Sequence, residues 1–163
     1  MKSINEISFT GKKVFIRVDF NLPFNDSGEI TDSSRIVAAL PTIEYVLSKG
    51  GACILASHLG RPVGKNPELS LKKIIPDLKK LLGKDVIFLA DSIGDQTKEA
   101  CSNLKNGEIV LLENLRFYEE ETKADVDFAK ELSGLADIYI NDAYGTTHRE
   151  HASTATIAQF FSE

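Results

Sequence analysis

The 163-residue chain has no tryptophan, one methionine and only two cysteines, Cys53 and Cys101. Neither cysteine has another cysteine or a histidine nearby at the spacing of metal ligands, which argues against a zinc site. So few cysteines also argue against a small secreted domain held together by disulfides. We therefore expect two free thiols in a reducing compartment.

Long apolar runs are missing as well. No stretch reaches the ~18 apolar residues that a membrane span needs, and the first residues, Met-Lys-Ser-Ile-Asn-Glu, contain no apolar signal core. The net charge of −5 argues against nucleic acid or an anionic membrane as the main partner, because both need a positive surface. We expect a soluble, cytoplasmic protein.

Apolar residues nevertheless make up 42% of the chain, enough to form the core of one domain. Short apolar runs rich in Val and Ile show little alternation with polar residues, which is typical of strands covered on both faces. The runs are residues 14–18, 52–56, 86–90, 109–112 and 138–140. Helical patterns cover residues 33–47, 71–82, 95–104, 125–135 and 153–161, with Gly83 as a C-cap.

This alternation predicts an α/β fold: a doubly wound, Rossmann-like arrangement of three layers around a parallel sheet. No internal repeat or Pro/Gly-rich linker divides the sequence, so we expect a single domain. The last residues, Phe-Phe-Ser-Glu, form no polar tail, and we interpret them as a cut inside a longer protein.

The five arginines and three histidines are not spread evenly. Open parallel sheets bind ligands beyond the carboxyl ends of their strands, and the segments that follow four of the predicted strands are residues 19–23, 57–62, 113–117 and 141–151. These segments contain His58, Arg61, Arg116, His148, Arg149 and His151. Arg35 begins the first predicted helix, and Arg17 lies inside a strand.

Guanidinium groups suit bidentate contacts with phosphate and carboxylate oxygens, whereas the fourteen lysines are distributed over helices and turns. Four segments from distant parts of the chain thus bring cationic or hydrogen-bonding side chains to the edge of the predicted sheet where its strands end. This arrangement predicts a site for a small, multiply charged anion. Taken singly, each group has a simpler interpretation. A lone arginine or histidine is usually a surface or structural residue, Asp19 and Asn21 could cap the turn before Pro23, and we expect Arg17 to be a partly buried charge paired with a carboxylate.

Other motifs are weak. Residues 60–66 resemble a phosphate-binding loop loosely, with one residue too few between the glycines and Asn66 where Ser or Thr should bind magnesium. Asp19, Glu113 and Asp142 could bind a metal in principle, but the surrounding arginines would compete for them. We therefore predict no metal site.

Four motifs together resemble the phosphoglycerate kinase family. They are Arg-Val-Asp-Phe-Asn-Leu-Pro at 17–23, Ser-His-Leu-Gly-Arg-Pro at 57–62, Glu-Asn-Leu-Arg-Phe at 113–117 and Asn-Asp-Ala-Tyr-Gly-Thr-Thr-His-Arg at 141–149. Asp-Ser-Ser-Arg-Ile at 32–36 resembles the helix start that carries an essential arginine in that family. The motifs keep the family order and cover nearly the whole chain. Leu22, Ser34, Leu115 and Tyr144 depart from the common residues, none of them at a charged site position.

The resemblance implies a role for each site residue. Asp19 and Asn21 would hold the hydroxyl and backbone of 3-phosphoglycerate, and Arg35 would contact the carboxylate and stabilise the phosphoryl group in flight, as the catalytic residue. The non-transferred phosphate would be bound by His58, Arg61, Arg116 and Arg149, with His148 and His151 lining the same basic patch.

The resemblance also implies that residues 1–163 are the N-terminal, substrate-binding domain of a longer enzyme. Its nucleotide-binding domain, absent from this chain, would bind Mg-ATP or Mg-ADP, so we expect no cofactor on this chain and no activity in isolation. The implied partners are 3-phosphoglycerate or 1,3-bisphosphoglycerate and the missing C-terminal domain, in a monomer. A stand-alone anion-binding module and another doubly wound enzyme acting on a different acid phosphate stay open.

Overall fold

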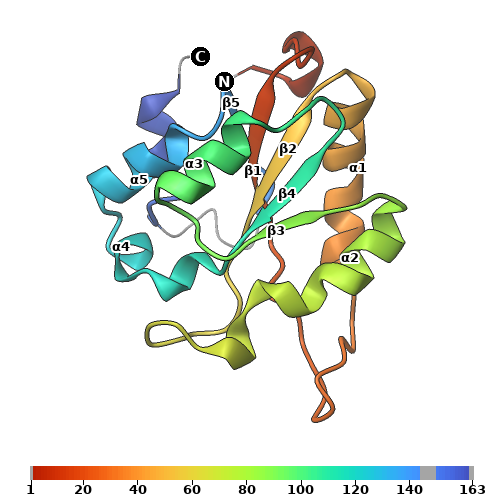
Figure 1. Cartoon of the computed structure of the whole chain (residues 1–163), viewed down its shortest axis with the longest axis vertical. Helices are drawn as coiled ribbons and strands as arrows, with labels where there is room; N and C mark the ends of the chain where they lie inside the picture. The colour runs from red at the N-terminus through yellow and green to blue at the C-terminus, as the bar shows by residue number, and fades with distance from the viewer. Residues whose placement is uncertain (1, 144–149, 162–163) are drawn as a thin grey trace.

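The structure, a computed structural model, describes residues 2–143 and 150–161. At its centre lies a five-stranded sheet in which every neighbouring pair is parallel. Its strands are β1 (Lys13–Arg17), β2 (Ala52–Ala56), β3 (Ile87–Leu89), β4 (Ile109–Leu112) and β5 (Ile138–Asn141). The spatial order is β3-β4-β2-β1-β5 (Figure 1). The predicted parallel sheet and all five predicted strand positions are confirmed.

The helices form one layer on each side of this sheet (Figure 1). On one side lie α1 (Ser34–Ser48) and α2 (Ile75–Leu82), whose buried residues share a core with one face of the sheet. On the other side α3 (Asp95–Ser102), α5 (Val126–Ser133) and the 3₁₀ helix Thr156–Phe160 contribute to a second core. The short helix α4 (Glu119–Thr122) precedes α5. The three-layer α/β fold is therefore confirmed.

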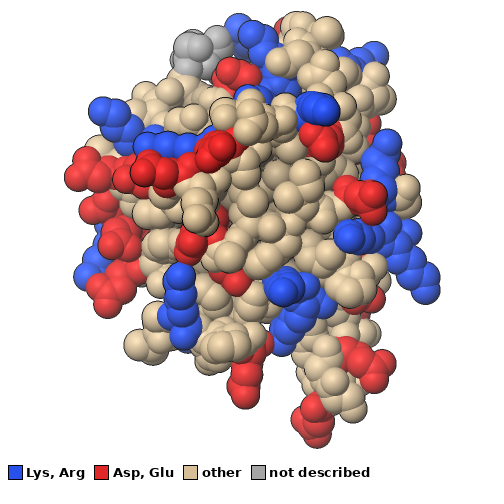
Figure 2. All heavy atoms as spheres, in the orientation of Figure 1, with Lys and Arg blue, Asp and Glu red and all other residues tan. Residues whose placement is uncertain are grey.

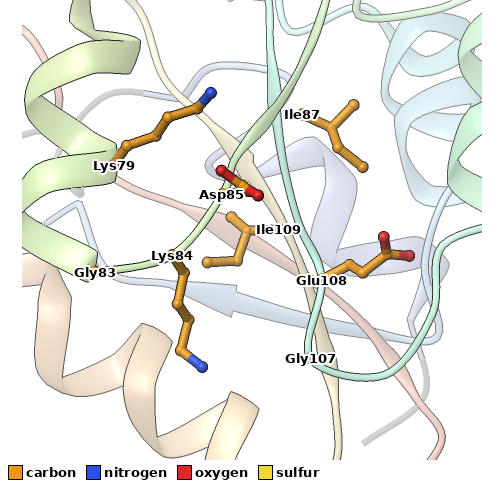
Figure 3. A pocket seen from close by; sticks show the side chains of 8 residues that line it. All are labelled: Lys79, Gly83, Lys84, Asp85, Ile87, Gly107, Glu108 and Ile109. Carbon is orange, nitrogen blue, oxygen red and sulfur yellow. The ribbon is translucent and has the colours of Figure 1, made fainter.

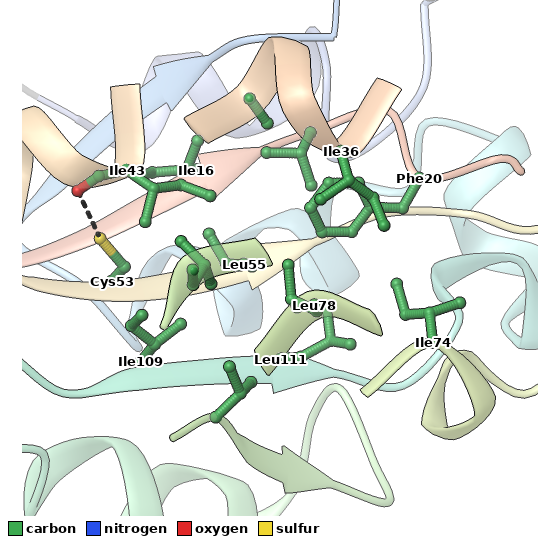
Figure 4. Close-up of a cluster of buried hydrophobic side chains, with 14 of the residues drawn as sticks. Ile16, Phe20, Ile36, Ile43, Cys53, Leu55, Ile74, Leu78, Ile109 and Leu111 are labelled. Atoms are coloured by element: carbon green, nitrogen blue, oxygen red, sulfur yellow. Dashed lines mark hydrogen bonds between the residues drawn. The ribbon is translucent and has the colours of Figure 1, made fainter. Parts of the chain in front are cut away.

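The two cores arise because successive strand residues point to opposite faces. In β2, Cys53 and Leu55 belong to the core beneath α1 and α2, whereas Ala52, Ile54 and Ala56 belong to the other. Figure 4 shows the first core, where the Cys53 thiol lies 3.9 Å from the carbonyl oxygen of Ile43. Both cysteines are free and buried, and burial raises the pKa of Cys53 to about 12 and that of Cys101 to about 11.

The predicted helices agree with the structure to within two residues at each end, except in two segments. Residues 71–82 form a 3₁₀ turn, Leu71–Ile74, followed by α2. Pro76 lies in the first turn of α2, where its missing amide hydrogen removes no hydrogen bond of the helix, which is consistent with α2 beginning at Ile75. Of residues 153–161, only Thr156–Phe160 is helical, and it is a 3₁₀ helix. Gly83 ends α2 with a φ of 66°, as its predicted capping role requires.

Leu55→Ala should destabilise the chain by about 2–5 kcal/mol, because Leu55 is fully buried in the central strand and the substitution leaves a cavity. Urea unfolding followed by circular dichroism measures this free energy. Val63→Ala is the matched control, since Val63 is 97% exposed and should change the free energy of unfolding by less than about 0.5 kcal/mol. Equal effects of the two substitutions would contradict the assignment of the core.

Candidate anion site at the carboxyl ends of the strands

The strands end at a common edge. Arg17, the last residue of β1, is aligned with Ala56 at the end of β2 and with Asn141 at the end of β5. Leu55 is aligned with Leu111, so β4 ends at nearly the same level. The segments that follow β1 and β2 both extend from the lower end of the sheet in Figure 1. The sheet therefore places residues 19–21, 57–61 and 113–116 at one edge, as predicted.

Arg35 lies in the first turn of α1, where it was predicted, and reaches across to the segment after β1. Its Nη1 donates to the backbone oxygen of Asn21 at 2.6 Å and contacts Oδ1 of Asp19 at 3.3 Å. The side chain of Arg35 is 50% exposed. An ion pair this open contributes at most about 1 kcal/mol. An incoming anion can therefore compete with Asp19 for this guanidinium at little cost.

Asp19 and Asn21 also have the structural role that the sequence left open. Oδ1 of Asp19 accepts a hydrogen bond from the backbone amide of Asn21 at 3.1 Å, which fixes the turn before Pro23. The side-chain oxygen of Asn21 accepts from the backbone amide of Gly60 at 2.8 Å. Asn21 thus joins the segment after β1 to the segment after β2.

Arg116 extends this connection to a third segment. Its Nη1 donates to the backbone oxygen of Gly60 at 3.3 Å. Gly60 has a φ of 63°, and an added Cβ would meet the side chain of Leu69 at 3.0 Å, so a side chain here would be strained. Arg61, the next residue, is exposed. Asn21, Gly60 and Arg116 thus hold three post-strand segments together, with Arg61 and Arg35 open to solvent beside them.

Asn114 organises the same edge, although sequence reasoning gave it no role. Its Oδ1 accepts from the amides of Leu59 and Arg116, and its Nδ2 donates to the backbone oxygens of Leu59 and Leu69. A fully buried amide whose donors and acceptor are all used fixes the backbone around it. The only signal in the sequence was its position directly after a predicted strand.

The two described histidines of the predicted site lie below the surface, with exposures of 3% for His58 and 9% for His151. Nδ1 of His58 is 3.0 Å from Nη2 of Arg17. The backbone amide of His151 donates to the hydroxyl of Thr154 at 3.1 Å. His148 and Arg149, which were also predicted, lie outside the described residues.

Arg17 is paired with a carboxylate, as predicted, but it is buried more deeply than the predicted partial burial. It is fully buried, and its Nη2 lies 3.9 Å from a carboxylate oxygen of Glu121, which is also fully buried. Burial lowers the pKa of Arg17, and the nearby Glu121 opposes this change. A guanidinium remains protonated even so.

The carboxylates considered as metal ligands lie in separate environments. Asp19 contacts Arg35, and Glu113 accepts hydrogen bonds from the Ser70 hydroxyl and from the amides of Leu71 and Asn114. Partial burial raises the pKa of Asp142, and a hydrogen bond from Thr42 partly opposes this. Within residues 2–143 and 150–161, no three His, Cys, Asp or Glu side chains gather as metal ligands would.

The surface of the described chain has two hollows of note. One, of about 630 Å³, lies at the opposite edge of the sheet, where β3 and β4 begin (Figure 3). Lys79 and Lys84 line it together with Asp85 and Glu108, so its charges balance. A second, of about 470 Å³, lies beside the candidate edge between Pro67 and Phe117.

Charges of both signs are distributed over the face that Figure 2 shows, with acidic side chains gathered over α4 and α5. This face carries no continuous basic surface (Figure 2). In the described part of the chain, no helix is long and apolar enough to cross a bilayer.

Comparison of the sequence with known proteins agrees with the family that the four motifs resemble. A model of the phosphoglycerate kinase family matches residues 4–163. The chain is 50% identical over 158 residues to "Phosphoglycerate kinase 3, cytosolic" of Arabidopsis thaliana, covering 97% of this chain and 39% of that protein. It is 53% identical over 158 residues to the phosphoglycerate kinase of Desulforudis audaxviator, covering 96% of this chain and 40% of that protein. The chain therefore spans about two fifths of the length of these relatives.

Solved structures agree with the sequence comparison. The crystal structure of phosphoglycerate kinase from Pyrococcus horikoshii superposes with a TM-score of 0.89 at 33% identity, covering 99% of this chain and 41% of that one. The enzyme from Coxiella burnetii superposes with a TM-score of 0.87 at 34% identity, covering 98% of this chain and 39% of that one. The chain thus belongs to the phosphoglycerate kinase family.

Proposed function

We propose that this chain is the N-terminal, substrate-binding part of a phosphoglycerate kinase and that it binds 3-phosphoglycerate or 1,3-bisphosphoglycerate at the carboxyl edge of its sheet. The observation that carries the proposal is the connection of three post-strand segments through Asn21, Gly60 and Arg116, with Arg35 beside them. A protein of net charge −5 that holds its scarce arginines at one edge suits a small anion with more than one charge.

Arg35 and Arg116 would divide the ligand between them. Arg35 is half exposed, and its contacts are a weak ion pair with Asp19 and a hydrogen bond to the backbone oxygen of Asn21. It would contact the carboxylate of 3-phosphoglycerate and the phosphoryl group during transfer. Asp19 and Asn21 would hold the hydroxyl and the backbone of the same ligand. The non-transferred phosphate would be bound by His58, Arg61, Arg116 and Arg149, with His148 and His151 lining the same basic patch.

In the complete enzyme the reaction would be reversible transfer of a phosphoryl group between 1,3-bisphosphoglycerate and ADP. Such transfer needs no protein nucleophile, because positioning and charge stabilisation lower its barrier. Mg-ATP or Mg-ADP would be bound by the part of the enzyme that this chain lacks. We place the enzyme in the cytosol and expect a monomer.

Calorimetric titration of this chain with 3-phosphoglycerate tests the proposal. We expect weak, saturable binding, and the affinity should fall as salt is raised from about 50 to 200 mM, because exposed charge pairs carry most of it. Glycerate, which lacks the phosphate, should bind far more weakly. No heat of binding, or equal heats from glycerate and 3-phosphoglycerate, would contradict the proposal. Equal affinity for unrelated phosphorylated acids would favour a general anion-binding module instead.

A further inference from the structure

A buried polar network beneath the candidate edge connects segments that are far apart in the sequence. Arg17, at the end of β1, donates from Nε to the hydroxyl of Ser153 at 2.8 Å and from Nη1 to the backbone oxygen of Val18. Its Nη2 faces Nδ1 of His58 at 3.0 Å. One fully buried guanidinium therefore contacts the segment after β2 and the segment around residue 153.

Glu121 is the acidic member of this network and contacts both Ser153 and Arg17. One carboxylate oxygen accepts from the backbone amide of Ser153 at 2.8 Å, and the other accepts from the Ser153 hydroxyl and faces Arg17. The backbone oxygen of Glu121 also accepts from the amide of Ala152 at 2.8 Å, and the hydroxyl of Tyr139 donates to the backbone oxygen of Ser153 at 2.7 Å. Residues 152–153, which directly follow His151, are thus fixed to α4 and β5.

The contact between Arg17 and His58 determines the protonation of the imidazole. A guanidinium carries only donors. Nδ1 of His58 must therefore be the acceptor at 3.0 Å, which leaves the single ring proton on Nε2. A doubly protonated ring has no acceptor and would place a second positive charge against Arg17. Among the described residues, Glu121, Tyr139 and Asp19 are charged or ionisable groups close enough to act on Arg17, and Glu121 is its buried ion-pair partner.

We propose that Glu121 and Arg17 are positioning residues of the anion site, and that they hold His58 as a neutral ring protonated on Nε2. In this state the ring of His58 carries one N–H group and no net charge, so the charge of the ligand would be met by the arginines. The consequence for ligand binding rests on the proposed function, whereas the protonation state of His58 is a property of the chain without ligand.

Nitrogen-15 NMR of the histidine side chains in the unmodified chain at pH 7 tests the protonation state directly. Long-range correlations between ring nitrogens and ring protons distinguish the two neutral tautomers and the imidazolium. We expect His58 to show a protonated Nε2 and an unprotonated Nδ1. A protonated Nδ1, either alone or together with Nε2, would overturn the proposal. The result does not depend on whether 3-phosphoglycerate binds, so its failure and the failure of the proposed function are distinguishable.

Substitution of Glu121 tests its positioning role. Glu121→Gln keeps the shape of the side chain but removes the buried counter-charge that holds Arg17 in place. We expect Arg17 to leave its position against Nδ1 of His58 in part of the molecules, so that His58 shows a mixture of tautomers and the affinity for 3-phosphoglycerate falls roughly tenfold. Glu120→Gln is the matched control, because Glu120 is the neighbouring residue and its carboxylate is exposed. This substitution should change neither the tautomer of His58 nor the affinity for 3-phosphoglycerate.

Ser153→Ala provides a second test if Glu121→Gln does not fold. It removes the hydroxyl between Arg17 and Glu121 but retains both charges. We expect the fold to persist, as read from the amide spectrum, with loss of the single His58 tautomer and a severalfold weaker affinity. An unchanged His58 tautomer with unchanged affinity in a folded Ser153→Ala variant would show that the network does not position the site.

Discussion

The isolated chain is expected to give no measurable phosphoryl transfer between ATP and 3-phosphoglycerate. Transfer requires both substrates in line at a separation of about 3 Å, with water excluded and magnesium on the nucleotide. In the proposed site the described arginines would bind one substrate, and the nucleotide with its magnesium would be bound by the part of the enzyme that this chain lacks. The chain also spans only about two fifths of its relatives.

A coupled assay with ATP, magnesium and 3-phosphoglycerate measures this expectation. The purified chain alone should give the rate of the blank. Activity should appear when the remaining part of the Desulforudis audaxviator relative, produced separately, is added and associates with the chain. Arg35→Ala should abolish this regained activity, because in the proposed site this arginine would stabilise the charge of the phosphoryl group during transfer. Robust turnover by the chain alone would mean that it holds a complete nucleotide site, and the proposal of a half-enzyme would be wrong.

The second large effect concerns ligand affinity. Arg116→Ala should weaken binding of 3-phosphoglycerate about tenfold or more, because a hydrogen bond to a charged group contributes roughly 1.5–3 kcal/mol. Arg116→Lys should recover only part of the loss, since an ammonium lacks the planar fork of a guanidinium. The same expectation applies to Arg149. Titration calorimetry of each folded variant gives the affinities.

Lys79→Ala is the control for this series. It removes one positive charge, as Arg116→Ala does, but Lys79 lines the hollow at the opposite edge of the sheet. Its effect on the affinity should be negligible. Equal losses from Lys79→Ala and Arg116→Ala would show that net charge alone attracts the ligand, and would reject the placement of the site.

Much of the fold was predictable because buried parallel strands leave a strong pattern. The runs at β1, β2 and β4 are apolar at nearly every position, and these strands lie at the centre of the sheet with both faces covered. The gathering of polar groups after the strands was predictable for the same reason, since parallel strands end at one edge. Helix α4 was not, because a single turn contains too few residues to show a period.

The buried contacts beneath the candidate site could not be predicted from the sequence. Glu119, Glu120 and Glu121 form an acidic run that indicates a solvated surface, yet Glu121 is fully buried. Its burial depends on contacts with Arg17 and Ser153, which lie far from it in the chain. The residues next to Glu121 in the sequence give no indication of such contacts. The depth of His58 likewise depends on packing against Arg17 from another strand. Sequence reasoning identified the ring as a candidate phosphate contact, but it did not predict that the ring is buried.

The most direct test of the proposed site is an amide NMR titration of the isotopically labelled chain with 3-phosphoglycerate. If the ligand binds at the carboxyl edge, the largest shift changes should fall on the amides of Asn21, Gly60, Arg61 and Arg116, with saturation at one common affinity. The amides of Lys84 and Gly107, which line the hollow at the other edge, should not move. Shift changes centred on Lys84 and Gly107, with Gly60 and Arg116 unchanged, would contradict the proposed site.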